Sequence, residues 1–165
     1  MKIAVIGFGS IGKRHVQNLL SIPRIQIIIC TKQNILNSSP DRVRVVSSVS
    51  ECLREKPDVC IIANVSSIHV PIAIKFARAG IDLFIEKPLS NSLKQIEDLL
   101  ALVRKKKIIT QMGCQLRFHK CIKEMKRLIL SKEIGNVISV RVECGSFLPD
   151  WHPYEDYTKN YAARD

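Results

Sequence analysis

The first twelve residues contain the pattern that most restricts how this chain can fold. An apolar run at residues 2–6 leads directly into three glycines spaced G-x-G-x-x-G, and a helix-like pattern follows. In a doubly wound α/β sheet this spacing joins the first strand to the first helix, whose free amides then face a pyrophosphate. The pattern predicts a dinucleotide-binding turn, and the alternative is a glycine-bearing strand-to-helix turn without a ligand.

Each glycine of this turn has its own expected task. Gly7 allows the tight turn, Gly9 lets the backbone approach a pyrophosphate, and Gly12 lets the helix pack closely on the strand. The residues between them are expected to contribute to the same cofactor site: Phe8, Ser10 and Ile11.

The rest of the chain alternates apolar runs with helical patterns. Further strands are expected at about 24–31, 43–46, 59–63, 81–85 and 108–112. Helices are expected at about 10–20, 49–55, 69–79 and from Asn91 or Ser92 to a basic block at 104–107. Residues 34–41 are expected to form a loop. Short connections between alternating strands and helices indicate an α/β fold, a doubly wound (Rossmann) parallel sheet covered on both faces.

The pattern changes after residue 118. A helix is expected at 122–130, and the alternation of Val and Ser over 137–144 predicts a half-buried strand without a partner strand in the remaining residues. We therefore expect a dinucleotide-binding domain over 1–118 and, over 119–165, the start of an incomplete α+β substrate domain.

Charge and cysteine content bear on partners and compartment. Lys plus Arg exceed Asp plus Glu by 26 − 15 = 11, yet no aromatic residues interleave with the basic ones as stacking on nucleic acid requires. Anionic small molecules are therefore favoured over nucleic acid. The six cysteines lack C-x-x-C spacing, which predicts reduced thiols and no metal site. Because neither a signal peptide nor a membrane-spanning run is recognisable, a cytoplasmic protein without membrane contact is expected.

The residues after the second expected strand favour NADP over NAD. An acid about 20 residues past the glycines would bind the ribose hydroxyls of NAD, but residues 13–40 contain neither Asp nor Glu. The strand ends instead at Thr31 and Lys32, a hydroxyl and an ammonium that suit a 2′-phosphate. Both cofactors stay open, because a surface lysine often only points to solvent.

Two further short sequences follow strands whose carboxyl ends line the ligand crevice of such a sheet. Asn64 comes after the fourth expected strand, and Glu86-Lys87-Pro88 comes after the fifth. Spacing alone leaves two interpretations open, which are contacts to a cofactor or an ordinary helix cap and a surface ion pair.

Together these motifs resemble the glucose-fructose oxidoreductase, inositol dehydrogenase and rhizopine catabolism family of nicotinamide-dependent enzymes. The resemblance rests on the glycine turn, on Ile61-Ile62-Ala63-Asn64 with His69 shortly after, and on Glu86-Lys87-Pro88 before a helix, and it extends over about 1–165. It implies an NAD(P)-dependent oxidoreductase that moves a hydride between the nicotinamide and a sugar, polyol or sugar-nucleotide carbon.

The same resemblance implies individual roles. Lys87 would reach the nicotinamide and the reacting hydroxyl as the catalytic residue, Glu86 would help to fix the cofactor, and Pro88, in cis, would set the turn. For His69 a plain helix cap is the alternative to a cofactor contact. Further cofactor contacts are implied for these residues: Ala63, Asn64 and Arg117.

The chain departs from the family in one respect. Family members continue into an open sheet that covers the substrate, forms homo-oligomers and supplies an aspartate and a histidine four residues apart, and no such pair occurs here. His119 and His152 are the only candidates after residue 112 for the proton acceptor. We therefore expect the 165 residues to be a fragment, a truncated product or the ordered part of a longer chain. The alternative function is a catalytically silent dinucleotide-binding or regulatory module.

Overall fold

The computed structural model describes residues 1–35, 40–151, 156 and 158, and it divides into two compact units, Met1–Cys114 and Gln115–Asp165. The loop expected at 34–41 therefore lies partly outside the described residues. Within the described part of the chain, no helix combines the length and the apolar character that crossing a bilayer requires.

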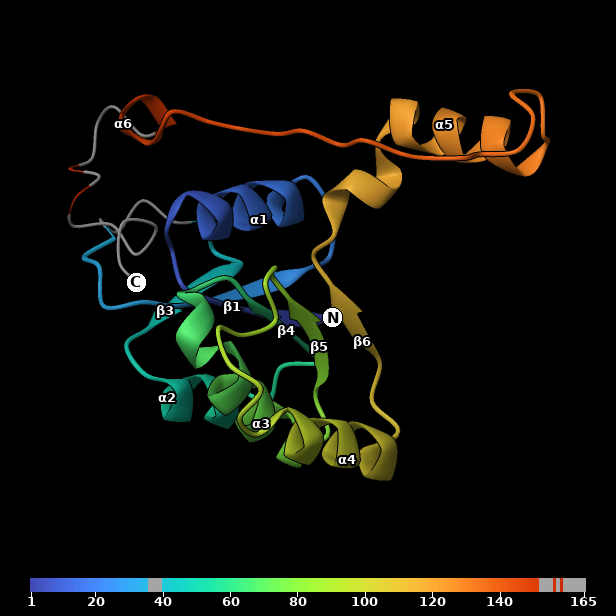
Figure 1. Ribbon diagram of the computed structural model, residues 1–165. Helices are drawn as coiled ribbons and strands as arrows, with labels where there is room; N and C mark the ends of the chain where they lie inside the picture. The colour runs from blue at the N-terminus through green and yellow to red at the C-terminus, as the bar shows by residue number, and fades with distance from the viewer. Residues whose placement is uncertain (36–39, 152–155, 157, 159–165) are drawn as a thin grey trace. The chain divides into compact units, whose positions relative to one another are not determined.

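The first unit alternates strands and helices in the predicted order (Figure 1). Its strands are β1 (Lys2–Ile6), β2 (Gln26–Cys30), β3 (Val43–Val46), β4 (Val59–Ile62), β5 (Asp82–Ile85) and β6 (Thr110–Met112). Its helices are α1 (Ser10–Leu20), α2 (Val49–Arg54), α3 (His69–Arg78) and α4 (Ile96–Lys106), with the 3-10 helix η1 (Ser66–Ile68) before α3.

The six strands form one parallel sheet in the order β3-β2-β1-β4-β5-β6. β1 lies between β2 and β4, so that Ala4 pairs with Ile28 on one side and with Cys60 on the other. Figure 1 shows α1 on one face of the sheet and α2, α3 and α4 on the opposite face. This confirms the doubly wound α/β fold, in which the carboxyl ends of β2, β1, β4 and β5 meet at one edge.

Successive strand residues point into two different cores. Ile3 and Val5 pack in the core that includes Val16 of α1, whereas Ala4 and Ile6 belong to the larger core beneath the other helices. Burial of side chains of this size contributes about 1.5–3 kcal/mol each. Because the central strands are covered on both faces, they consist of nearly continuous apolar residues, and this is why the sequence identifies them.

Helix α4 begins later than the sequence predicts. A cap at Asn91 or Ser92 is expected, whereas the helix starts at Ile96. The Ser92 hydroxyl instead accepts a hydrogen bond from the Lys94 amide at 3.3 Å, and Leu93 is 87% exposed. A serine side chain that binds nearby backbone competes with helix formation, which explains the turn at this position.

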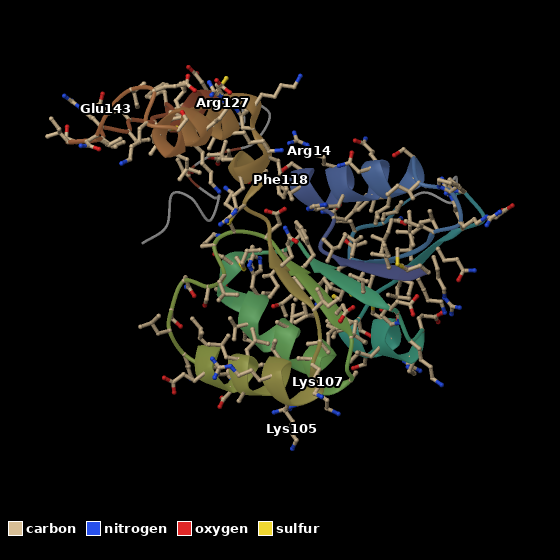
Figure 2. All side chains as sticks on the ribbon, turned by 90° about the vertical axis from the view of Figure 1, so that its right-hand side faces the viewer. Arg14, Lys105, Lys107, Phe118, Arg127 and Glu143 are labelled. Atoms are coloured by element: carbon tan, nitrogen blue, oxygen red, sulfur yellow. The ribbon has the colours of Figure 1, made fainter. Side chains whose placement is uncertain are left out.

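The basic block does end α4 as predicted. Arg104, Lys105 and Lys106 occupy its last turn, and Lys107 follows in the left-handed conformation. Figure 2 shows the side chains of Lys105 and Lys107 extending outward at the end of this helix. Cations at this position are stabilised by the negative end of the helix dipole, so the basic block requires no anionic partner.

The second unit contains a prominent helix and lacks the predicted strand. Its described elements are η2 (Gln115–Phe118), α5 (Lys120–Leu130) and the short α6 (Leu148–Trp151). The strand expected over 137–144 is not formed, and Ile138 and Val142 are 99% and 83% exposed. A half-buried strand needs a neighbouring strand and a core on one face, and the described residues of this unit provide neither.

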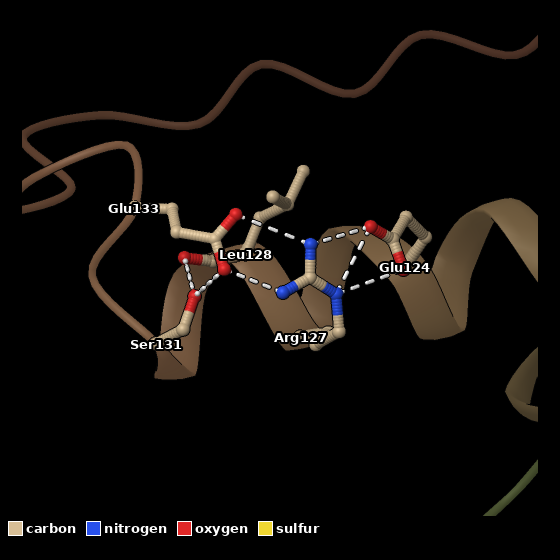
Figure 3. A network of polar contacts seen from close by, with 5 residues as sticks. All are labelled: Glu124, Arg127, Leu128, Ser131 and Glu133. Atoms are coloured by element: carbon tan, nitrogen blue, oxygen red, sulfur yellow. Dashed lines mark hydrogen bonds and ion pairs between the residues drawn. The ribbon is translucent and has the colours of Figure 1, made fainter.

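Arg127 of α5 organises the end of that helix (Figure 3). Its guanidinium donates hydrogen bonds to Glu124 at 2.8 Å and to Glu133 at 2.5 Å, and the Ser131 hydroxyl donates to Glu133 at 3.0 Å. The contact with Arg127 lowers the pKa of the Glu133 carboxyl. These bonds hold the residues after α5 against its last turn.

Candidate functional site

Gly7 adopts a backbone conformation that only glycine adopts readily. Its φ is +95°, and its amide donates to the carbonyl of Cys30 at 3.0 Å. A Cβ at this position would lie 2.9 Å from the carbonyl oxygen of Ala63 and 2.9 Å from the backbone of Asn64. The chain therefore turns sharply at Gly7 between the ends of β2 and β4.

The start of α1 is open and carries no negative charge of its own. Gly9 is the N-cap, no side chain caps the helix, and the first turn contains no acid. A Cβ on Gly9 would meet no atom of the described part of the chain within 4 Å. The first amides of a helix have no intrahelical partners, so they are available to an anion here. The Lys13 ammonium, 5.7 Å from the centre of the Phe8 ring, adds positive charge beside the turn.

Within the same turn, Ser10 and Ile11 are exposed, whereas Gly12 is buried. These residues therefore lie where the sequence expects them, and their contacts with a cofactor stay predictions.

The end of β2 presents a hydroxyl and an ammonium. The Thr31 amide donates to the carbonyl of Val46 at 3.0 Å, and the Thr31 hydroxyl accepts from the amide of Gln33 at 3.1 Å. Lys32 is exposed. This turn therefore fixes the backbone around Lys32, whose ammonium has no partner among the described residues.

Helix α2 places a carboxylate, that of Glu51, near the end of β2, and the sequence did not predict it there. Glu51 accepts hydrogen bonds from the Ser47 amide at 3.0 Å and the Ser48 hydroxyl at 3.0 Å, and these bonds lower its pKa. Burial raises the pKa of the Cys30 thiol, and the negative charge of Glu51 raises it further by a smaller amount. Glu51 is thus engaged in capping α2 near the end of β2.

The residue that follows each of β4 and β5 adds one more backbone hydrogen bond to the neighbouring strand. The Ala63 amide donates to Ile6 and the Glu86 amide donates to Ile62, both at 2.9 Å. The side-chain oxygen Oδ1 of Asn64 is buried and has no partner among the described residues. A buried amide oxygen without a donor costs about 1–3 kcal/mol, so this position suits a ligand that donates a hydrogen bond.

His69 links these two strand ends from inside the protein. Only 1% exposed, it places Nε2 2.9 Å from the Asn64 carbonyl and Nδ1 3.0 Å from the Pro88 carbonyl. Both partners are carbonyl acceptors, so the imidazole N–H donates to one of them and the ring lies between the two backbone segments. The geometry shows a bridge between the ends of β4 and β5, and the predicted cofactor contact stays a prediction.

Lys87 is exposed after β5, and its ammonium has no partner among the described residues. The Lys87–Pro88 peptide bond is cis, as the resemblance implies. The Glu86 carboxylate is not paired with Lys87 but lies 2.8 Å from Nε2 of His15, in α1. Sequence reasoning missed His15, although a histidine three residues after Gly12 interrupts the buried side of that helix.

The strand order thus brings together all predicted site residues of the first unit. Arg117 lies in η2 of the second unit, and His119 precedes α5; their proposed roles stay predictions. His152 lies outside the described residues. Among the described residues no group of three or more His, Cys, Asp or Glu side chains is arranged to hold a metal ion.

Comparison with known proteins gives a family match over most of the chain. Residues 1–114 match the GFO/IDH/MocA model, described as an oxidoreductase family with an NAD-binding Rossmann fold. The oxidoreductase YrbE of Bacillus subtilis is 33% identical over 137 residues, covering 79% of this chain and 40% of that protein. A scyllo-inositol 2-dehydrogenase (NAD(+)) of the same organism is 31% identical, covering 84% of this chain and 42% of that protein.

Solved structures share the fold. The structure of scyllo-inositol dehydrogenase from Lactobacillus casei with bound NAD(H) and scyllo-inositol superposes with a TM-score of 0.70 at 21% identity, covering 82% of this chain and 42% of that one. The chain spans about two fifths of the length of the relatives that it matches.

Proposed function

This chain belongs to the oxidoreductase family with an NAD-binding Rossmann fold, and we propose that it binds a nicotinamide dinucleotide and serves hydride transfer to or from a sugar, polyol or sugar-nucleotide carbon. The observation that carries the proposal is the open start of α1, where a Cβ on Gly9 would meet no atom of the described residues within 4 Å and no side chain caps the helix. The free amides and the positive end of the helix dipole suit the negative charge of a pyrophosphate.

The residues at the neighbouring strand ends support the same ligand. Among the described residues, the buried side-chain oxygen of Asn64 has no donor and the exposed ammonium of Lys87 has no acceptor. A bound nicotinamide would supply the hydride donor or acceptor. Lys87 would hold the reacting oxygen of the substrate and stabilise the negative charge that develops there.

Fluorescence of the reduced nicotinamide tests binding directly. Increasing amounts of the chain are added to NADH and to NADPH, and saturable binding below millimolar concentration is expected for at least one. Gly9→Ala places a methyl group in the open space and is expected to weaken binding about tenfold, a loss of about 1.4 kcal/mol. Gly145→Ala, which also adds a methyl group in open space, is the matched control. No saturable binding by the wild type would overturn the proposal.

Thr31 and Lys32 favour NADP over NAD as the preferred cofactor. A charge-assisted contact between the exposed Lys32 and a 2′-phosphate contributes about 1.5–3 kcal/mol. Lys32→Ala is therefore expected to weaken NADPH binding about tenfold or more while NADH binding stays unchanged. Lys105→Ala, at the outward end of α4 in Figure 2, is the control for lost positive charge. An unchanged ratio of the two dissociation constants in Lys32→Ala would contradict the preference.

A dinucleotide-binding module without turnover is the second candidate. The observation that favours it is that the family match covers residues 1–114 and is described as an NAD-binding Rossmann fold. Steady-state assays with sugars, polyols and sugar nucleotides separate the two candidates, since the module would bind cofactor and turn over none of them.

A further inference from the structure

The contact between His15 and Glu86 joins the two motifs of the proposed site, although neither motif predicts it. Nε2 of His15, in the helix that follows the glycine turn, lies 2.8 Å from Oε1 of Glu86, at the end of β5. Both side chains are largely shielded, with exposures of 20% and 16%. A pair at this depth is screened less by solvent than an exposed ion pair.

The position of His15 in α1 explains why it needs a partner. Gly12, Val16 and Leu19 form the buried side of this helix, and His15 lies three residues after Gly12 on that side. Its ring meets the edge of the Phe84 ring, with 5.3 Å between the ring centres. A polar group on this side requires a hydrogen bond, and Glu86 provides the acceptor.

The Glu86 carboxylate is held from two further sides. Its Oε2 accepts the Lys87 amide at 3.3 Å. Gly113, directly after β6, packs so closely that a Cβ there would lie 2.9 Å from the carboxyl carbon and 2.9 Å from Oε2. The carboxylate therefore occupies a space bounded by α1, by its own turn and by the end of β6.

We propose that His15 is a positioning residue that holds the Glu86 carboxylate away from the Lys87 ammonium and so keeps Lys87 available at the nicotinamide end of the cofactor. This inference rests on the proposed function. Glu86 and Lys87 are adjacent and oppositely charged, yet the carboxylate pairs with His15 and the ammonium has no partner among the described residues. Without His15 the carboxylate loses its shielded donor, and Lys87 becomes the nearest replacement along the chain.

The test compares two probes on the full chain. One is NADH or NADPH, whichever binds the wild type more tightly, and the other is the matching fragment without nicotinamide, ADP-ribose or 2′-phospho-ADP-ribose. His15→Ala is expected to weaken dinucleotide binding about tenfold and to leave fragment binding within about twofold. His15→Gln, whose amide can still donate to Glu86, is expected to restore most of the dinucleotide affinity. Gln17→Ala, an exposed position on the same helix, is expected to bind both probes as the wild type does.

Gly113→Ala tests the same contact without altering α1. The three heavy atoms nearest to the added methyl group all belong to the flexible end of Glu86, and Gly113 lacks a positive φ. The fold can therefore accept the substitution, whereas the carboxylate must move off His15. Selective loss of dinucleotide affinity is expected again, and circular dichroism melting checks that each variant is folded.

The possible results are separable. If the wild type binds neither probe, the proposed function is overturned and this inference with it. If the wild type binds both and His15→Ala binds the dinucleotide equally well, the inference alone is overturned. Equal loss of both probes in His15→Ala and Gly113→Ala also overturns it, because the contact then serves only the fold. If His15→Ala does not fold, the dinucleotide affinities of His15→Gln and Gly113→Ala decide. The inference is supported if only Gly113→Ala binds the dinucleotide more weakly, and it is overturned if the two variants bind it equally well.

Discussion

A methyl group on Gly12 would lie 2.1 Å from the carbonyl oxygen of Gly7 and 2.9 Å from its carbonyl carbon. Both atoms belong to the backbone of the glycine turn, so neither can move without opening the turn. We expect Gly12→Ala to lower the free energy of unfolding by about 3 kcal/mol. Urea denaturation followed by circular dichroism measures the loss. Gly9→Ala, in which the methyl group meets open space, is the control and should change the free energy of unfolding by less than about 1 kcal/mol. A loss in Gly12→Ala no larger than that in Gly9→Ala would contradict the close contact between Gly12 and Gly7.

Lys87→Ala should separate the chemical role of this lysine from the fold. Its ammonium has no structural partner among the described residues, so the substitution is expected to leave the fold unchanged and to weaken dinucleotide binding about tenfold, as His15→Ala does. Loss of a charge that stabilises the transition state lowers turnover by about 100-fold or more. Steady-state rates with a panel of sugars, polyols and sugar nucleotides are the measurement. Unchanged turnover in an active wild-type preparation would exclude Lys87 from catalysis.

His69 should matter for stability far more than an ordinary helix-starting residue. Phenylalanine at this position fills the buried space but removes the N–H that donates to one of the carbonyls of Asn64 and Pro88. We expect His69→Phe to cost about 1–3 kcal/mol in unfolding free energy. His119→Ala, at an exposed position before α5, is the comparison and should cost less than about 0.5 kcal/mol. Similar melting curves for both variants would contradict the bridge.

The six cysteines should react in two groups. Burial raises the pKa of the Cys52 thiol to about 12 and that of Cys60 well above its usual value, and it also raises the pKa of Cys30. A raised pKa leaves little thiolate at pH 8, and the thiolate is the reactive form. Titration with a disulfide reagent at pH 8 should modify the exposed thiols first and the other three only after unfolding in urea. Those exposed thiols are Cys114, Cys121 and Cys144. Rapid modification of a fourth thiol in the native protein would contradict this grouping.

The strands of the first unit could be predicted because their burial on both faces produces continuous apolar runs. Ile27, Ile28 and Ile29, for example, are all 1–2% exposed. The start of α4 could not be placed in the same way, because the cap depends on which backbone amide the Ser92 hydroxyl binds. The strand predicted at 137–144 has the right alternation, but alternation does not supply the neighbouring strand that the pattern needs.

The positions of the candidate site residues differ in how far they could be predicted. The places of the glycine turn and of the residues at the strand ends could be predicted, since a parallel sheet places the carboxyl ends of neighbouring strands together. The contact between His15 and Glu86 could not, because its members are 71 residues apart and each is unremarkable in its own segment. Gly113 matters for a similar reason, since its role depends on the position of a distant carboxylate.

The place of Gly113 in the chain gives the site an order of assembly. A ribosome releases the N-terminal residues first, and the glycine turn needs only β1, β2 and β4 beside it. The Glu86 carboxylate meets its last neighbour only when β6 has paired with β5 and the Gly113 amide has bonded to the carbonyl of Ile85, at 2.8 Å. A growing chain that has not yet added β6 to the sheet therefore has its glycine turn before its Glu86-Lys87 turn is fully enclosed. On the proposed function, the part expected to bind the pyrophosphate forms earlier in synthesis than the part expected to meet the nicotinamide.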